Sequence, residues 1–171
     1  MKNTDNSVIQ PGTFRLAEMG EIPKQVFKER PKLEKSSILV GKVFPKLIKE
    51  YGFPNQVYYP CSGFDISPSS SFKDVIYLDA KAEVVGLLRA AGLKAYQADV
   101  RHFNPDRGID LLILFNPCLN RKETENLAKR ISPNFVLCNN YHNTEKYMKS
   151  VEGFTFEGNI EKLYSVFAKN K

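Results

Sequence analysis

Short apolar runs, separated by polar and turn-forming segments, recur through the last two thirds of this chain. The most apolar of them, 109–115, is nearly continuous, which is typical of a central strand covered on both faces of a sheet. Four shorter runs lie before and after it. We therefore expect strands at 57–59, 75–78, 93–98, 109–115 and 135–138.

Between these runs the apolar positions change to helical spacing. Over 84–91 they recur every three or four residues, and Gly92 follows as a stop signal, so a helix is expected there. Asn120 can cap a helix over 121–131. The link 67–72 is short and rich in Ser and Pro, and we expect only one or two helical turns in it.

The amino-terminal third follows a different pattern. Residues 1–35 contain several Pro and Gly and no sustained period, which predicts an irregular arm with one short helix near 14–19. Over 36–51 apolar residues return at helical spacing and Gly52 ends the pattern. Pro45 either kinks this helix or begins its second half.

The chain ends with a short predicted helix near 144–151 and two strand-like segments, 153–156 and 163–167, close enough in sequence to pair as an antiparallel hairpin. Alternating strands and helices followed by a hairpin predict a three-layer, doubly wound α/β sheet that is mostly parallel. We assign 1–52 to a basic arm and helix, and 53–171 to the sheet domain.

Composition agrees with one folded domain. The chain has 171 residues, of which 42% are hydrophobic and 26% charged, as in soluble globular proteins. The apolar stretch 111–115 is far too short for a bilayer span, and the polar start 1–6 has no signal-peptide core. A cytoplasmic protein without a membrane partner is expected.

Three cysteines, Cys61, Cys118 and Cys138, bear on redox state and metals. Their number is odd and their spacing lacks the close pairs of a zinc site. We expect reduced thiols and no metal.

Positive charge is concentrated near the amino terminus. The whole chain carries a formal charge of +6, and eight basic residues against two acidic ones between Lys24 and Lys49 account for that value. Such a segment is typical of a polyanion-binding arm, since each neutralised phosphate releases counterions. A helix face or loop kept soluble by lysines is an equally good explanation. The basic residues are Lys24, Lys28, Arg30, Lys32, Lys35, Lys42, Lys46 and Lys49.

Candidate chemistry lies where strands end. Asp79 closes the second strand, Asp99 follows the third, and Gly63 lies in the turn after the first. A turn without side-chain bulk lets the backbone approach a ligand, and a carboxylate after the second strand can accept both hydroxyl protons of a ribose. Helix caps or ordinary turn residues would also explain these positions.

This order of elements, with the hairpin last, resembles the Rossmann-like class I S-adenosylmethionine-dependent methyltransferases over 56–171. The resemblance implies the strand order 3-2-1-4-5 and S-adenosylmethionine as cofactor. In that family an acidic, glycine-rich turn after the first strand surrounds the methionine part of the cofactor. Here 60–67 holds that place with Gly63, and Asp65 supplies a carboxylate from a shifted position.

The same resemblance assigns further contacts. Asp79 matches the acidic residue that grips the ribose diol. Asp99 matches the position that meets the adenine amino group, and Val100 lies beside it with backbone donors for the ring.

After the fourth strand, amino-group methyltransferases of this family carry Asn-Pro-Pro-aromatic or Asp-Pro-Pro-aromatic. Asn116 and Pro117 match the first two positions, and Cys118 and Leu119 depart from the rest. Asn116 and Pro117 are thus the candidate catalytic residues, but a flat base would lack its stacking partner in this loop.

The sequence therefore favours a methyltransferase whose acceptor is unknown. Nucleic acid, recruited by the basic segment, is one candidate acceptor. A degenerate methyltransferase fold that binds nucleic acid or protein without catalysis is the alternative. A nicotinamide-dependent oxidoreductase is disfavoured, because no Gly-x-Gly-x-x-Gly opens a helix after the first strand.

Overall fold

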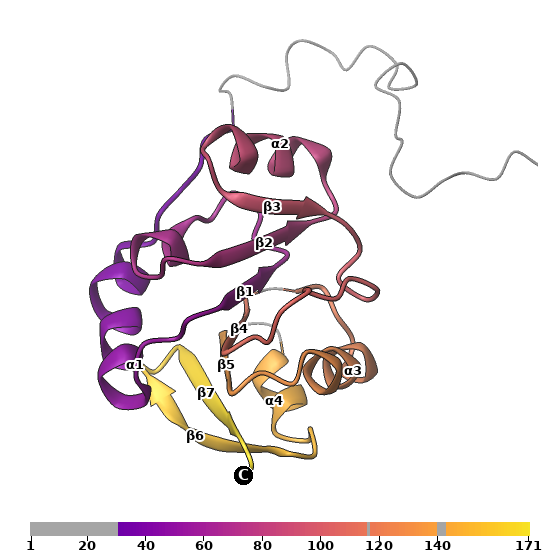
Figure 1. The fold of residues 1–171 in the computed structure, drawn as a ribbon. Helices are drawn as coiled ribbons and strands as arrows, with labels where there is room; N and C mark the ends of the chain where they lie inside the picture. Colours follow the sequence, from indigo (N-terminus) through magenta and orange to yellow (C-terminus); the bar gives the residue numbers. More distant parts are fainter. Residues whose placement is uncertain (1–30, 116, 140–142) are drawn as a thin grey trace, which may run out of the picture. The chain divides into compact units, whose positions relative to one another are not determined.

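A computed structural model describes residues 31–115, 117–139 and 143–171 (Figure 1). Its helices and strands all belong to one compact unit, Lys32–Lys171. The helix expected near 14–19 lies outside the described residues. In chain order the elements are a π-helical turn η2 (Leu39–Val43), α1 (Phe44–Tyr51), β1 (Val57–Pro60), a 3₁₀ turn η3 (Ser67–Ser70), β2 (Val75–Asp79), α2 (Ala82–Ala90), β3 (Lys94–Gln97), β4 (Leu111–Leu114), α3 (Arg121–Ile131), β5 (Phe135–Asn139), α4 (Thr144–Met148), β6 (Phe154–Ile160) and β7 (Tyr164–Lys169).

The strands form one seven-stranded sheet in the order β3-β2-β1-β4-β5-β7-β6. Strands β1 to β5 are parallel, and β7 runs antiparallel to both β5 and β6. The expected strand order and terminal hairpin are confirmed. Strand β4 is shorter than expected at both ends, and β6 is longer, reaching Ile160.

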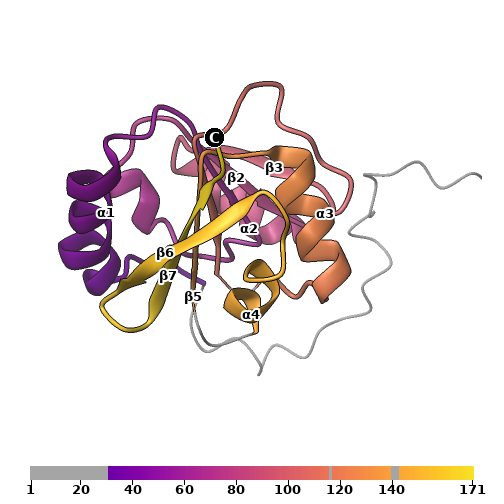
Figure 2. The same ribbon diagram turned by 90° about the horizontal axis from the view of Figure 1, so that it is seen from below.

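Two apolar cores lie on opposite faces of the sheet. Successive strand residues alternate between them, so that Tyr59 and Ile113 belong to one core and Tyr58 and Leu112 to the other. Helices α1 and α2 pack on the first core, and α3 and α4 pack on the second. Figure 2 shows α1 and α3 on opposite sides of the strands. This arrangement is the expected three-layer α/β architecture.

The helical segment before the sheet continues through Pro45. A proline in an α-helix removes a hydrogen bond and clashes with the carbonyl four residues back. Here Pro45 lies in the first turn of α1, directly after the wider π-helical turn η2, so the chain remains helical to Tyr51. Gly52 ends the helix with a φ of 87°, a conformation that favours glycine.

Helix α1 belongs to the folded unit. Phe44 and Leu47 are fully buried in the first core, and the Phe44 ring packs edge-on against Phe72, with the ring centroids 5.0 Å apart. The segment 37–52 that we grouped with the basic arm is therefore part of the packed structure.

Local signals placed two further elements correctly. Asn120 caps α3 through a reciprocal pair, in which its side-chain oxygen accepts from the Glu123 N–H at 3.0 Å and its own N–H donates to the Glu123 carboxylate at 2.9 Å. The link between β1 and β2 holds only the short turn η3, as expected. Among the described residues, no helix is both long and apolar enough to span a membrane.

Candidate functional site

An open pocket of about 390 Å³ lies at the carboxyl edge of the parallel strands. Five segments that are distant in sequence form its lining: the approach to α1, the turn after β1, and the ends of β4, β5 and the hairpin. A pocket outside the carboxyl ends of strands, near the point where the strand order reverses, is the usual ligand site of an open α/β sheet. The lining residues are Ser36, Leu39, Tyr59, Cys61, Ser62, Gly63, Asp65, Phe115, Asn139 and Tyr164.

The turn after β1 presents open backbone to this pocket. Gly63 has a φ of 55°, and a Cβ built on it would meet no heavy atom within 4 Å. Cys61 has a φ of 54°, which is uncommon for a residue with a side chain. The turn therefore leaves open space beside the backbone of Gly63.

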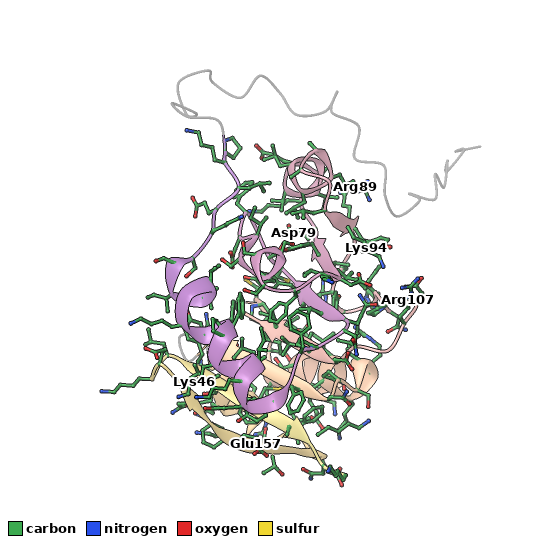
Figure 3. All side chains as sticks on the ribbon, turned by 60° about the vertical axis from the view of Figure 1, so that its left-hand side comes forward. Lys46, Asp79, Arg89, Lys94, Arg107 and Glu157 are labelled. Atoms are coloured by element: carbon green, nitrogen blue, oxygen red, sulfur yellow. The ribbon has the colours of Figure 1, made fainter. Side chains whose placement is uncertain are left out.

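Asp79 meets the same turn from the end of β2. One carboxylate oxygen accepts from the Gly63 N–H at 3.1 Å and the other from the Lys81 N–H at 2.9 Å. Asp79 is only 9% exposed, and Figure 3 shows it within the body of the fold, whereas Lys46 and Arg107 project at its periphery. An ionised carboxylate offers about four lone pairs, so these two bonds leave capacity for a ligand hydroxyl.

Asp65 is engaged by the protein. Its carboxylate accepts from the Tyr59 hydroxyl at 3.0 Å and from the Ser67 N–H at 2.8 Å, and it also bonds the Ser67 hydroxyl. Burial, with the Asp65 charge second, raises the pKa of Tyr59 well above its usual range, so that hydroxyl keeps its proton. Asp65 thus holds the turn in shape while one side of it lines the pocket.

A connection that the sequence did not indicate holds the pocket wall. Glu34 forms a short parallel bridge with the turn, donating its N–H to the Phe64 carbonyl at 2.8 Å and accepting from the Ile66 N–H at 2.9 Å. The Ser36 N–H donates to the Ser67 hydroxyl at 2.7 Å. The irregular arm predicted for residues 1–35 therefore ends earlier than expected, because Glu34 is already bonded to the folded domain. The signal that points the other way is Leu33, which packs against the first core.

Asp99 and Val100 lie at the same sheet edge, after β3, and do not line the pocket. Arg101 donates hydrogen bonds to the Asp99 carboxylate from its Nε, at 2.9 and 3.0 Å, and from its backbone N–H, at 2.8 Å. Val100 is buried, and its carbonyl accepts from Arg130 of α3 at 2.6 Å. The loop after β3, which contains both residues, is therefore held by two arginines.

The Asp99–Arg101 pair predicts a pH-dependent contribution. Hydrogen bonds from Arg101 lower the pKa of Asp99 from 3.8 to about 2. A lowered folded-state pKa stabilises the fold above the unfolded value, and this contribution is lost as pH falls from about 4 to about 2. We expect Arg101→Ala to return the Asp99 titration toward its ordinary pKa, measured by carboxyl ¹³C NMR.

Arg107→Ala is the matched control, since Arg107 pairs with Asp74 at 3.8 Å and takes no part in the Asp99 contacts. An Asp99 titration that is unchanged in Arg101→Ala would contradict the assigned cause.

Of the two candidate catalytic residues, Asn116 lies outside the described residues. Pro117 is buried, and its carbonyl lies 3.7 Å from the Cys61 sulfur as a weak hydrogen-bond acceptor. This contact joins the loop after β4 to the turn after β1. Pro117 is thus adjacent to the pocket, while Cys118 is exposed with a φ of 46°.

The three thiols should differ in reactivity. Burial, reinforced by Asp79, raises the pKa of Cys61 to about 12, and burial raises the pKa of Cys138 as well. Because the thiolate is the nucleophile, we expect iodoacetamide at pH 8 to alkylate the exposed Cys118 first, as read by mass spectrometry. In urea the three should react at similar rates. Equal labelling of Cys61 and Cys118 in the folded protein would refute the assignment.

A smaller hollow of about 140 Å³ lies at the opposite edge of the sheet, near Tyr51 and Asp110. The Asp110 carboxylate accepts from the N–H groups of Asn55 and Gln56 at 2.8 and 3.2 Å and from the Asn134 side chain at 2.9 Å. These bonds tie loops together, so this carboxylate is structural. Within the part of the chain that is described, no three His, Cys, Asp or Glu side chains gather to hold a metal ion.

Sequence reasoning missed the aromatic wall of the carboxyl-edge pocket. Phe115 packs edge-on against Tyr59, with the ring centroids 5.7 Å apart, and in a tilted arrangement against Tyr164, with the centroids 5.3 Å apart. The sequence pattern places Tyr59 and Phe115 in separate strands and Tyr164 in the terminal hairpin. No local pattern shows that these three rings meet.

Comparison with known proteins finds similar folds among solved structures but no similar sequences. No family model matches the sequence, and no curated protein matches it. A putative RNA methyltransferase from Pyrococcus horikoshii superposes with a TM-score of 0.60 at 16% identity, over 84% of this chain and 92% of that one. The N-methyltransferase NodS from Bradyrhizobium japonicum, in complex with S-adenosyl-L-homocysteine, gives a TM-score of 0.57 at 13% identity, over 75% of this chain and 85% of that one.

An rRNA methylase from Escherichia coli superposes with a TM-score of 0.57 at 16% identity, over 75% of this chain and 62% of that one. At such identities the likeness shows the fold. The chain has the Rossmann-like fold of the class I methyltransferases.

Proposed function

We propose that this protein is an S-adenosylmethionine-dependent methyltransferase. The observation that carries the proposal is the contact between the Asp79 carboxylate and the Gly63 N–H, 3.1 Å apart, beside an open pocket at the carboxyl edge. This contact joins the two features that a ribose-bearing ligand requires, an anionic acceptor and an approachable backbone. The bound S-adenosyl-L-homocysteine named for one structural neighbour supports the choice of ligand.

The residues present fit that cofactor. Asp79 would accept from the ribose hydroxyls with the lone pairs that Gly63 and Lys81 leave available. The turn around Gly63, with Asp65 behind it, would hold the methionine part, and Asp99 and Val100 would flank the adenine. Arg101 must share Asp99 with the ligand, because it now occupies both carboxylate oxygens.

When bound, the cofactor supplies a methyl group already activated by its sulfonium. The protein then needs chiefly to align the acceptor atom with that methyl and to keep water away. Pro117 and Asn116 belong to the loop in which an acceptor would be oriented, and the side-chain oxygen of Asn116 would accept a hydrogen bond from the acceptor group. The buried, neutral Tyr59 hydroxyl is held by Asp65 and keeps the turn in place.

Thermal unfolding with S-adenosylmethionine and S-adenosylhomocysteine tests the proposal. A ligand at about one hundred times its dissociation constant adds about 2.7 kcal/mol, and for a domain of this size that raises Tm by several degrees. Adenosine and methionine serve as controls at the same concentration. If neither S-adenosylmethionine nor S-adenosylhomocysteine shifts the Tm, the result would favour a degenerate fold that binds other partners. The structural neighbours do not favour that alternative.

We further propose that the acceptor is carried by nucleic acid and that the basic segment recruits it. Two of the structural neighbours described above are named as RNA methyltransferases. Lys24, Lys28 and Arg30 lie outside the described residues, and the other five lysines are exposed on or before η2 and α1. The helical segment starts beside the pocket, which Ser36 and Leu39 line, and α1 leads from there to the opposite edge of the sheet, where Leu47 and Tyr51 line the smaller hollow.

Salt-dependent binding tests this recruitment. Because residues 34–36 bond the turn after β1, the truncation should remove residues 1–31 and leave the folded unit, which begins at Lys32. In a separate variant Lys42, Lys46 and Lys49 should be changed to Gln. We expect each neutralised phosphate contact to lower the slope of log K against log salt by about one. A slope unchanged in both variants would remove the basic segment from the interface.

A further inference from the structure

The hairpin brings Tyr164 to the carboxyl edge of the sheet. Tyr164 opens β7 directly after the hairpin turn and pairs with Asn139, the last residue of β5. The turn itself lies beside η2, since Glu161 is 4.0 Å from the Lys42 ammonium. A residue near the end of the sequence is thereby placed opposite the turn after β1, across the pocket.

The Tyr164 ring packs against a neighbouring aromatic ring. Its centroid is 5.3 Å from that of Phe115 at an interplanar angle of 57°, and Phe115 in turn contacts Tyr59 edge-on at 77°. Tyr59 is buried and hydrogen-bonded to Asp65. The wall is therefore backed by packed side chains, while Tyr164 itself is half-buried and faces the pocket of about 390 Å³.

This wall suits a planar ring. Aromatic side chains stack on nucleobases, a contact that tolerates any base because each has a π-face. Asn139 lines the same pocket beside Tyr164, and an amide side chain carries both hydrogen-bond donors and an acceptor. An aliphatic acceptor would gain little from three rings, whereas a flat heteroaromatic ring would gain the stacking contact.

From this geometry we infer that Tyr164 is the stacking platform for a planar heteroaromatic acceptor, a nucleobase, in the methyl-transfer pocket. The inference deepens the proposed function and rests on it. The loop after β4 continues from Pro117 into Cys118 and Leu119 and has no aromatic residue of its own. The hairpin supplies from a distant part of the chain the ring that this loop lacks.

Equilibrium binding to Tyr164→Leu and Tyr164→Phe tests the inference. The probes are adenosine, guanosine, cytidine, uridine and a single-stranded RNA hexamer, each titrated in the presence of S-adenosylhomocysteine, with cyclohexylamine as a non-planar amine. We expect Tyr164→Leu to weaken binding of at least one nucleoside or the hexamer about tenfold or more, and Tyr164→Phe to stay within about twofold of the unchanged protein. Binding of the hexamer alone identifies a base within a strand, and binding of a nucleoside identifies a free base.

Phe156→Leu is the matched control, because Phe156 lies on β6, is 39% exposed and packs on Phe167 away from the pocket. Equal affinities of Tyr164→Leu and the unchanged protein, or cyclohexylamine binding as tightly as the planar probes, would overturn the inference. S-adenosylhomocysteine affinity is measured separately in each variant. If the unchanged protein does not bind S-adenosylhomocysteine, the proposed function is refuted. If Tyr164→Leu still binds S-adenosylhomocysteine but no longer binds the planar probes, the role of Tyr164 as a stacking platform is supported.

Discussion

Replacing Asp79 with alanine is expected to weaken the binding of S-adenosylhomocysteine about a hundredfold, measured by titration calorimetry. Hydrogen bonds to a charged group contribute about 1.5–3 kcal/mol each, and a ribose offers two hydroxyls to this carboxylate, so the combined loss is about 3 kcal/mol. The carboxylate is 9% exposed and fixed by two backbone N–H groups, so it is already oriented before a ligand binds. Little binding energy is then spent on ordering it.

The same substitution should also lower stability. Alanine leaves the N–H groups of Gly63 and Lys81 without their acceptor, at a cost of about 1–3 kcal/mol. Affinity must therefore be measured well below the Tm of the variant. Asp79→Asn keeps the shape and one acceptor oxygen, and we expect it to bind with intermediate affinity.

Asp74→Asn provides the control, because Asp74 lies just before the other end of β2. Asp74 precedes β2 at the opposite edge of the sheet, and its side chain is 38% exposed and pairs with Arg107. Its loss should leave affinity unchanged. Undiminished binding by Asp79→Ala would remove the ribose contact from the proposal, and with it the observation that carries the proposed function.

The largest loss of stability is expected for Leu112→Ala in the centre of β4. Leu112 is fully buried in the second core, and its strand lies between β1 and β5. Removing a leucine side chain from such a site costs about 2–5 kcal/mol, because apolar contacts are lost and a cavity remains. For a domain of this size the Tm should fall by about 10 °C, as read by calorimetry.

Ile38→Ala is the comparison, since Ile38 is 43% exposed at the start of the helical segment. We expect its free energy of unfolding to change by less than about 0.5 kcal/mol. A loss of the same size in both variants would show that β4 is not the packed centre of the sheet.

The two substitutions also separate stability from binding. Leu112 lies within β4, between its neighbouring strands. Asp79 is the last residue of β2 and bonds the turn after β1 beside the pocket. Leu112→Ala should retain its affinity for S-adenosylhomocysteine below its Tm, whereas Asp79→Ala should lose affinity even while folded.

Features governed by near neighbours in the sequence were predictable. The run of apolar residues around Leu112 indicated a buried central strand, and Asn120 with Glu123 indicated where α3 begins. Gly63 was predicted to lie in a turn, and its φ of 55° confirms that a glycine suits the position. In each case the physical cause, burial on both faces, a cap or a backbone angle, acts within a few residues.

The bridge of Glu34 to the turn after β1 could not be predicted in this way, because it joins residues that are far apart in the sequence. Its two hydrogen bonds join backbone groups some thirty residues apart, to Phe64 and Ile66, and backbone groups are the same in every residue type. Nothing in the side chains of 34–36 distinguishes an arm from a bridged segment. Asp65 was likewise recognised as a carboxylate near the site, but its engagement by Tyr59 required the two to be seen together.

Apolar periodicity, turn residues and acidic strand ends were enough to indicate the α/β sheet and to select Gly63, Asp79 and Asp99 as residues of one sheet edge, because parallel strands all end on that edge. That Gly63 lines the pocket together with Tyr164 depended on how β7 pairs with β5 and where the hairpin turns. Strand pairing between distant segments is set by the summed packing of the whole sheet. A single local pattern carries no record of that sum.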